Sequence, residues 1–442
     1  IRYLQPITAP DKILCVGLNY HLHAKEAGMA IPKTPSIFVR FPGAQVGHLE
    51  PTVRPKASEA FDYEAELAVI IGKPARHVTL DTAMQYVAGY SCFAENSLRD
   101  WQKHAAQATP GKNFQASGAF GPWLITADEV QQTARHIAEL QLPTGMIPWF
   151  PGGHCDPWNH VETAMALDVA GLHEEARLAY EWLASIQLHD GSWWNYYLPD
   201  GSVEEAKLDT NVCAYVATGV WHHWLCTWDR GFVDHLWPTV RRALDWVLSM
   251  RRPDGLALWA RTADETPWGY ALLTGTSSIA HALRCGVRLA ELAGEPRPDW
   301  VAAADTMTDA VANHPDAFEP KQRWAMDWYY PVLTGCLRGE AAAARLEQGW
   351  PTFAMPELGI RCVSDEPWVT ASETAEASIA YAAVGDFATA TDLLAWTRPH
   401  RTEHRADYTG LVRLELSEAL GLEEAVRLAD LRERHTGQRM RM

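Results

Sequence analysis

The spacing of apolar residues along the chain changes near residue 130. Before that point, short apolar runs bounded by Gly and Pro predict four strands, at 12–17, 36–41, 64–72 and 86–93. Short helices are expected at 21–28 and 98–105. The chain is therefore expected to begin with a mixed, β-rich part.

After residue 130 the apolar residues recur at helical spacing, and no strand signal of comparable strength appears. Gly, Pro and Asp separate the apolar segments, so short loops are expected between helices. The expected helices lie at 133–141, 160–169, 174–187, 212–227, 233–250, 277–293, 301–312, 324–337, 341–349, 371–384, 387–396 and 414–431. The second part is thus predicted to be all-α.

A repeat runs through the start of the helical part. Each unit has a helix end, a turn through Gly and an aromatic residue, as in Gln187 followed by Gly191 and Trp193. The turn glycines 145, 191 and 255 lie 46 and 64 residues apart. These intervals suit helical hairpins, and the Q-x-x-x-G-x-W pattern resembles the repeat of prenyltransferases and squalene-type cyclases. The resemblance implies an (α/α)6 toroid of six hairpins.

Composition shifts at the same place as the periodicity. Residues 1–127 hold 12 Lys/Arg and 10 Asp/Glu, a net charge of +2; since the whole chain carries −17, residues 128–442 carry −19. Of the 20 Trp residues, only Trp101 and Trp123 lie in the first part. We therefore predict a multidomain protein with domains at 1–127 and 128–442.

Charge and cysteine usage exclude several classes of function. The acidic second part argues against nucleic-acid binding, which needs clustered Lys and Arg. The chain contains no run of 18 apolar residues, so no membrane span is expected. It opens on Ile without a signal peptide, so the natural start is expected upstream. The eight cysteines form no C-x-x-C pair and are typical of buried thiols in a cytoplasmic protein.

The chemistry of the first part concentrates in acidic and basic motifs. Glu64 and Glu66 are two apart on an expected strand, so their carboxylates share one face. Such a pair repels unless a cation or proton lies between them, and Mg²⁺ or Mn²⁺ suits oxygen ligands. The alternative is a solvent-facing acidic pair. Nearby, His23 and Glu26 are three apart, the spacing of a base held by a carboxylate.

Five motifs in order make the first part resemble the fumarylacetoacetate hydrolase family over about residues 12–128. They begin at Gly17 (G-x-N-Y-x-x-H-x-x-E), Asp62 (D-Y-E-x-E-L-A-V-I-I-G), Gly89 (ending S-x-R-D-W-Q), Gly111 (G-K-x-F) and Gly121 (G-P-W-L). The resemblance implies a metal-dependent hydrolase or lyase that acts on a small 2-oxo or 1,3-dicarbonyl acid.

The resemblance also implies roles for individual residues. It assigns the metal ligands Glu64, Glu66 and Glu95, the catalytic residues His23, Glu26 and Lys112, and the substrate-binding residues Arg99 and Gln102. The third ligand is more often Asp in that family. The family's sheet also continues beyond the G-P-W-L motif, whereas here nothing of it follows. A truncated domain is therefore expected, with uncovered apolar faces and strand edges. Such edges favour a homodimer.

For the second part we expect a central cavity lined by acidic and aromatic residues. Asp156, Asp209 and Asp327 are the main candidates, because each lies near a Trp or just before a helix. Further polar candidates are His154, His160, Asn211, His222, His223, Arg261, Tyr330, Asp365, Glu373 and Glu376, and the aromatic ones are Trp149, Trp158, Trp221, Trp268, Trp328 and Trp368. Tryptophan rims with carboxylates suit sugars, and paired carboxylates suit glycosidases; packing and helix capping are the alternative roles.

Three functional hypotheses follow. The chain is a metal-dependent enzyme of the fumarylacetoacetate hydrolase type, or the helical toroid is the working domain and binds or processes a prenyl, terpenoid or glycan ligand. In the second case the first part is a remnant. A third hypothesis is that the join is an error of gene prediction or assembly, since residues 123–130 suit both families.

Overall fold

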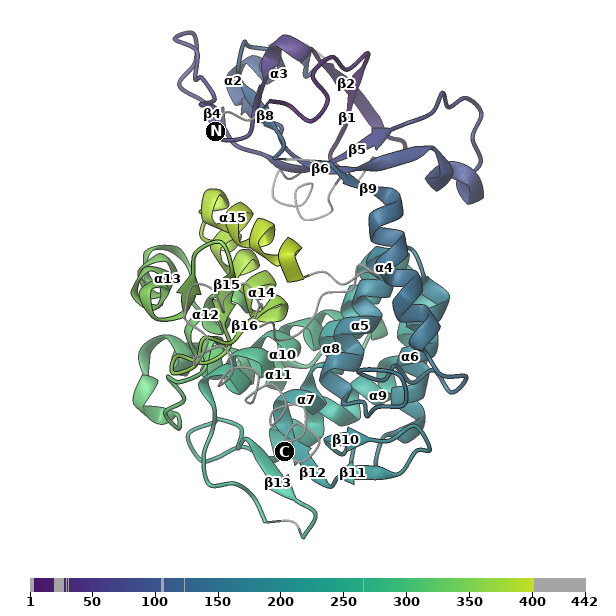
Figure 1. The fold of residues 1–442 in the computed structure, drawn as a ribbon, viewed down its shortest axis with the longest axis vertical. Coiled ribbons are helices and arrows are strands. Elements are labelled where there is room, and N and C mark those ends of the chain that lie inside the picture. The colour runs from purple at the N-terminus through teal and green to yellow at the C-terminus, as the bar shows by residue number, and fades with distance from the viewer. Residues whose placement is uncertain are drawn as a thin grey trace, which may run out of the picture. The chain divides into compact units, whose positions relative to one another are not determined.

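The computed structural model describes residues 4–19, 28, 30, 32–104, 107–122, 124–264 and 266–400. The chain divides into two compact units, at 1–131 and 132–442 (Figure 1). The composition shift at residue 127 lies close to this division. The predicted helices at 21–28 and 414–431 lie almost wholly outside the described residues, as do the catalytic candidates His23 and Glu26.

The first unit is a mixed-sheet domain. Its strands are β1 (Ile13–Gly17), β2 (Ser36–Arg40), β3 (Gln45–Gly47), β4 (Phe61–Asp62), β5 (Ala65–Ile71), β6 (Val87–Ala94), β7 (Ser97–Leu98), β8 (Gly118–Phe120) and β9 (Ile125–Thr126), with the short helices α2 (Arg99–Gln102) and α3 (Thr109–Lys112). The order β3-β8-β6-β5 forms the main sheet, to which β9 adds along β6. β1 pairs with β2 and β4 with β7, each antiparallel. The four predicted strands are confirmed, while the helix predicted at 98–105 is shorter.

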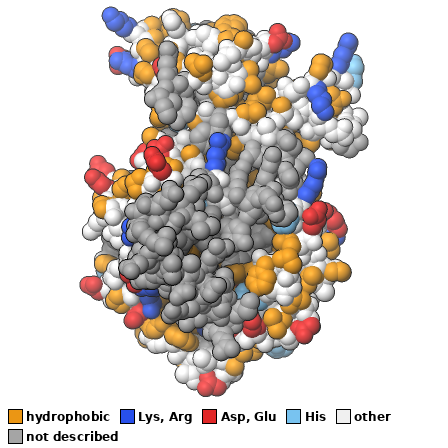
Figure 2. Space-filling view, viewed as in Figure 1, with side chains coloured by type: hydrophobic (Ala, Val, Ile, Leu, Met, Phe, Trp, Pro, Cys, Tyr) orange, Lys and Arg blue, Asp and Glu red, His pale blue; other side chains and the backbone are white. Residues whose placement is uncertain are grey.

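One face of this unit carries exposed apolar side chains. Along β5 the exposed residues are Leu67, Val69 and Ile71, alternating with half-buried ones. Leu14 on β1 and Ile37 on β2 are likewise exposed, and Figure 2 shows apolar side chains on the surface of the unit. The two-residue alternation that buries one face of a strand thus leaves an apolar second face. Exposed apolar side chains are what an uncovered sheet would leave, while the truncation of the domain stays a prediction.

The second unit is built mainly from helices. They are α4 (Ala127–Leu140, which spans the division), α5 (Pro157–Val169), α6 (His173–Ile186), α7 (Thr210–Ala214), α8 (Val216–Thr227), α9 (Arg230–Ser249), α10 (Leu273–Ala293), α11 (Pro298–Asn313), α12 (Ala325–Leu333), α13 (Gly339–Phe353), α14 (Ala371–Ala383) and α15 (Phe387–Thr397). The helix predicted at 212–227 is divided into α7 and α8 at Tyr215.

The helices pack as consecutive hairpins. One series of helices packs in a row, in the order α5, α8, α10, α12 and α14, with contacts between neighbours in the row. Each of these helices also contacts the helix that follows it in the chain. This alternation agrees with the predicted hairpins, while closure into a ring of six hairpins stays a prediction. The helical spacing predicted no strands of comparable strength in this part, and those observed are only two or three residues long. Short ribbons connect the helices: β10 (Tyr196–Tyr197), β11 (Val203–Glu205), β12 (Lys207–Asp209), β13 (Ala260–Thr262), β14 (Ala354–Met355), β15 (Gly359–Arg361) and β16 (Val369–Thr370).

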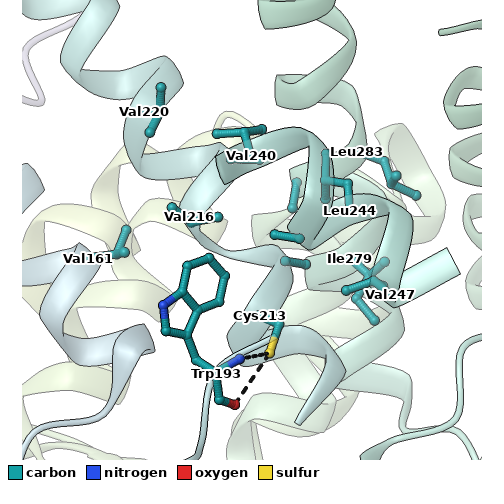
Figure 3. Close-up of a cluster of buried hydrophobic side chains, with 14 of the residues drawn as sticks. Val161, Trp193, Cys213, Val216, Val220, Val240, Leu244, Val247, Ile279 and Leu283 are labelled. Atoms are coloured by element: carbon teal, nitrogen blue, oxygen red, sulfur yellow. Dashed lines mark hydrogen bonds between the residues drawn. The ribbon is translucent and has the colours of Figure 1, made fainter. Parts of the chain in front are cut away.

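The sequence repeat has a structural explanation. Gln187 donates from Nε2 to the carbonyl of Gly191 and to the carbonyl of Thr239 on α9, both at 2.9 Å, and thereby joins two hairpins. Gln141 makes the corresponding bonds to Gly145 and Glu175. Trp193, which ends the motif, is 1% exposed and donates from Nε1 to the carbonyl of Leu183 at 2.8 Å. Figure 3 shows it among the apolar side chains of the core. The repeat therefore builds the scaffold.

Candidate functional site

A buried cluster in the first unit centres on Lys112. Its Nζ lies 2.9 Å from Oε1 of Glu64 and also donates to Oε2 of Glu95. Arg40 donates from Nη1 to Oε1 of Glu95 at 2.6 Å. Lys112, Glu95 and Arg40 are each at most 3% exposed. The two carboxylates therefore share an ammonium group in the protein interior, where an uncompensated charge would be costly.

The predicted substrate-binding residues lie beside this cluster. Arg99 contacts Oε1 of Glu64 at 2.9 Å and Oδ2 of Asp62 at 2.7 Å, and its Nη1 donates to Oε1 of Gln102 at 3.2 Å. Burial alone would raise the pKa of Glu64, but Lys112 and the other donors lower it. Burial dominates at Glu95 and raises its pKa despite Lys112.

The structure tests whether these residues suit a divalent metal. Glu66 lies on the same face as Glu64, since both are half-buried while Ala65 is exposed. However, among residues that the structure describes, no three His, Cys, Asp or Glu side chains are placed to hold a metal ion. The point where Glu64 and Glu95 converge is taken by the Lys112 ammonium. As arranged, this donor set does not fit a metal, and we derive no step through one.

A second cluster lies in the helical unit and centres on Glu162 of α5. Trp158 donates from Nε1 to Oε1 of Glu162 at 3.0 Å, and the hydroxyl of Tyr215 donates to the same oxygen at 3.2 Å. Burial raises the pKa of Glu162 to about 7, and the negative charges of Asp156 and Glu373 also act to raise it. The carboxyl of Glu162 therefore gains or loses its proton near neutral pH.

Glu376 of α14 is the second carboxyl of this cluster. It accepts a hydrogen bond from the hydroxyl of Tyr329. Burial raises the pKa of Glu376 well above its ordinary value, and the nearby charge of Glu162 adds to the effect. Both residues are half-buried, although protein surrounds their carboxyl groups closely enough for burial to be the main cause of both raised pKa values. We call Glu162, Glu376 and the nearby Asp156 and Glu373 the acidic centre.

Aromatic rings surround the acidic centre. Trp158 stacks on Tyr215, with ring centroids 4.0 Å apart, and lies 6.0 Å from the ring of Tyr330. Tyr329 and Tyr330 are adjacent on α12, and Tyr215 lies between α7 and α8. The wall is therefore assembled from three separate parts of the chain. Apolar ring faces next to carboxyls can contact the C–H face of a sugar while the carboxyls reach its oxygens.

The three main candidates of the helical part begin or lie near the start of helices. Asp156 caps α5: Oδ1 accepts from the Asn159 backbone at 3.0 Å, and Oδ2 accepts from Nε1 of Trp149 at 2.7 Å. Asp209 caps α7 through the backbone of Asn211 at 3.2 Å, and burial raises its pKa to about 6.

Asp327, in the first turn of α12, accepts from Oγ1 of Thr274 at 2.7 Å. Burial raises its pKa. Of the three candidates, Asp156 is the one that lies near enough to Glu162 for its charge to raise the pKa of Glu162. The helix-capping alternative therefore accounts for the contacts of Asp209, whereas Asp156 combines a cap with a place in the acidic centre.

Other polar candidates have contacts that explain them structurally. His160 is buried between the Ile147 backbone and the Ala179 carbonyl, and burial lowers its pKa to about 4. His222 and His223 face the buried Asp168, and Asp365 pairs with Arg323 at the surface.

Sequence reasoning included Glu373 and Glu376 among many rim residues but missed Glu162 and Tyr215. A signal was present for Glu162, because it is one of two carboxylates on the largely apolar helix α5 and lies four residues after Trp158. Tyr215 gave no comparable signal. It lies where α7 ends and α8 begins, with helical backbone angles, and its role becomes visible only in the contact of its hydroxyl with Glu162 on α5.

The chain is similar to two kinds of known protein. The fumarylacetoacetate (FAA) hydrolase C-terminal family matches residues 12–167. The human mitochondrial oxaloacetate tautomerase FAHD2A is 42% identical over 132 residues, which are 29% of this chain and 42% of the tautomerase. The chain thus spans less than half of that relative. A solved fumarylacetoacetate hydrolase from Exiguobacterium antarcticum is 36% identical, covers 28% of this chain and 46% of its own, and has a TM-score of 0.26.

A different relative matches most of the chain. The MMP endo-(1,4)-3-O-methyl-alpha-D-mannosidase of Mycolicibacterium hassiacum is 50% identical over 291 residues, which are 66% of this chain and 80% of that enzyme. Because the first unit has 131 residues, a match of this length must extend through much of the helical unit. Within the described residues, no helix has the length and apolarity needed to cross a membrane.

Proposed function

The chain belongs to the family of this endo-mannosidase and carries a fumarylacetoacetate-hydrolase-type domain ahead of it, and from this premise we propose that the helical unit hydrolyses an α-(1,4)-linked, O-methylated mannan chain. The observation that carries the proposal is the pair of neighbouring carboxyls, Glu162 and Glu376, both with raised pKa values, within a wall of aromatic rings. Glycoside hydrolysis commonly needs two carboxyls in different protonation states.

The hydrogen bonds of the two carboxyls favour different protonation states and therefore different roles in the reaction. Glu162 accepts two donors, from Trp158 and Tyr215, which favour its ionised form. Glu376 accepts one bond, from Tyr329, and its more strongly raised pKa keeps it protonated. In the proposed reaction Glu376 gives its proton to the glycosidic oxygen as the bond to the anomeric carbon breaks. Ionised Glu162 stabilises the positive charge that develops on the sugar ring. A water molecule then adds its oxygen to the anomeric carbon and gives a proton to the Glu376 carboxylate, which returns both carboxyls to their starting protonation states.

Asp156 supports this arrangement in two ways. Its hydrogen bond to Trp149 fixes an aromatic side chain, and its place at the start of α5 orients the helix that carries Trp158 and Glu162. Its charge also raises the pKa of Glu162.

The test is hydrolysis of a 3-O-methylated α-(1,4)-mannan by the full chain. We expect shorter oligosaccharides to be released by the natural protein, and we expect Glu376→Gln and Glu162→Gln to lose activity by about 10³-fold or more. Glu347→Gln, which changes an exposed carboxyl on α13, is the matched control and should retain full activity. Intact substrate after prolonged incubation with the natural protein, or active variants at both positions, would refute the proposal.

The prenyl and terpenoid ligands considered from the sequence repeat are set aside, because the relative that covers most of this chain is a mannosidase and the repeat has a scaffolding role. For the first unit, turnover of a small oxo acid stays a prediction, while the Lys112 ammonium between Glu64 and Glu95 argues against the Mg²⁺ or Mn²⁺ implied by the resemblance. The homodimer and the cytoplasmic location stay predictions as well.

A further inference from the structure

A pocket separate from the acidic centre lies between the loop after α6 and the ribbon β12–β13. Its volume is about 260 Å³, and Asp190, Trp194 and Arg261 are among its lining residues, together with His189, Leu208 and Thr262. None of these residues belongs to the acidic centre.

The topology places this pocket at the same end of the helical unit as the acidic centre. Helices α5 and α6 are joined by three residues and pack together as an antiparallel hairpin. The loop after α6 therefore lies at the end where α5 begins with Asp156. Strand β12 leads directly into α7, which ends just before Tyr215, so the other wall of the pocket is also continuous in sequence with the acidic centre. The pocket and the acidic centre therefore lie toward the same end of the helical unit.

The polar groups of the pocket are held in fixed positions. Arg261 donates from Nη2 to Oδ2 of Asp190 at 2.6 Å. The other oxygen of Asp190 accepts from the backbone and the hydroxyl of Ser192, at 3.0 and 2.6 Å. The guanidinium also lies 5.7 Å from the centre of the Trp246 ring. Its Nε is buried and has no acceptor among the described residues, an unsatisfied donor of the kind that a ligand or water completes.

The chemistry of the lining favours a neutral, hydroxyl-rich ligand. Asp190 offsets the charge of Arg261, so the pocket has no net attraction for an anion. The paired carboxylate and guanidinium instead present an acceptor beside donors, which suits neighbouring sugar hydroxyls. Trp194 supplies a half-buried aromatic ring for the C–H face of a sugar. The volume lies below the roughly 300–1,000 Å³ typical of drug-sized ligands, which suits a single ring.

We propose that this pocket is a secondary saccharide subsite. It holds one sugar ring of the substrate chain at a distance from the bond that the acidic centre cleaves. The inference rests on the proposed mannan hydrolysis. It adds that this pocket determines how well the enzyme binds substrates of different lengths. Binding far from the reacting bond is made equally in the substrate complex and the transition state, so its loss raises KM and leaves kcat nearly unchanged.

Arg261→Ala in the full chain tests the subsite with methylated α-(1,4)-manno-oligosaccharides of increasing length. We expect KM for the long oligosaccharides to rise about tenfold or more, because a charged hydrogen-bond donor is lost. For oligosaccharides too short to reach the pocket, KM should not change. Arg252→Ala is the matched control: Arg252 pairs with Asp254 in the corresponding turn of the repeat, outside the pocket lining. It should behave as the natural protein at every length.

A calorimetric titration of the longest oligosaccharide into Glu376→Gln, with and without Arg261→Ala, separates the subsite from the hydrolysis. If no oligosaccharide is hydrolysed but Arg261→Ala still weakens this binding about tenfold, the proposed function fails and the subsite stands. If hydrolysis proceeds and Arg261→Ala changes neither KM nor binding, the subsite is wrong and the hydrolysis stands. An equal rise in KM at all lengths would also overturn the subsite, and melting temperatures identify variants that fail to fold.

Discussion

The indole of Trp158 and the phenol of Tyr215 stack with their planes 8° from parallel and donate to the same oxygen of Glu162. One ring comes from α5 and the other from the break between α7 and α8. The stack therefore fixes both the position and the protonation of a carboxyl that neither helix could control alone.

Tyr215→Phe should shift the pH dependence of hydrolysis. The variant keeps the stacked ring but loses the hydroxyl that favours ionised Glu162, so the pKa of Glu162 should rise further above about 7. Because ionised Glu162 is the active form, the acidic limb of the pH–rate profile should move up by about one pH unit. Tyr381→Phe, which loses a buried hydroxyl bonded to the Leu346 carbonyl, should leave the profile in place. An unshifted limb in Tyr215→Phe would contradict the assignment of Glu162.

The buried Asp168 predicts a pH range of greatest stability for the helical unit. Burial alone would raise its pKa, but the neighbouring His222, His223 and His173 lower it to about 2. Burial alone would likewise lower the pKa of His222, but Asp168 and Cys226 raise it to about 9. The Asp168 carboxylate contributes its full stabilisation above pH 3.8, its pKa in the unfolded chain, and this contribution is lost as pH falls toward 2. The imidazolium stabilises it below 6.5 and less as pH rises toward 9.

Thermal melting of the natural protein and Asp168→Asn across pH 3 to 9 measures this contribution. The difference in melting temperature should be largest between about pH 4 and 6.5 and should shrink toward pH 9. His314→Asn, which removes an exposed partner of Asp309, should follow the natural protein. A difference that stays constant over the whole range would show that these groups do not titrate on folding.

Replacement of Lys112 is expected to destabilise the first unit strongly. Lys112→Met removes the ammonium that Glu64 and Glu95 share and leaves their charges buried. We expect a loss of about 3 kcal/mol or more in the free energy of unfolding of this unit. Lys103→Met, at an exposed position three residues after Asp100, should change it by less than about 0.5 kcal/mol. Denaturant titration followed by near-ultraviolet circular dichroism compares the two variants.

The same geometry predicts how the first unit responds to metal. In EDTA-stripped natural protein, the Lys112 ammonium lies where Glu64 and Glu95 converge, so calorimetric titration of Mn²⁺ should give little saturable binding. Lys112→Met should bind the ion more tightly, and adding Glu64→Ala should abolish that binding. Saturable binding by the natural protein that Glu64→Ala removes would instead support the metal site implied by family resemblance.

The local spacing of apolar residues was enough to predict the helices and strands, but it was not enough to predict the acidic centre. A two-residue period predicted the strand of Glu64 and Glu66 and their shared face, since that depends on the backbone alone. Helical spacing likewise predicted α5 and α6 to within a few residues. The burial of Glu162 could not be predicted, because it depends on Tyr215, which is 53 residues away. No Gly or Pro marks the break that places Tyr215.

The turn glycines of the repeat provide a test of the helical scaffold. Gly191 has a φ of +101°, and a Cβ added there would lie 2.4 Å from the carbonyl oxygen of Arg242 on the next hairpin. Gly191→Ala should therefore cost backbone strain and also push two hairpins apart, a loss of about 3 kcal/mol or more. Gly201 has a similar φ of +83° but nothing within 4 Å of the added Cβ, so Gly201→Ala should cost only about 1 kcal/mol. Because the two variants share the strained backbone and differ in the contact, the difference in their unfolding free energies measures the packing of the hairpins at this turn. Equal losses would mean that the repeat glycine is needed for its backbone conformation alone, and that the close approach of Arg242 relaxes without cost.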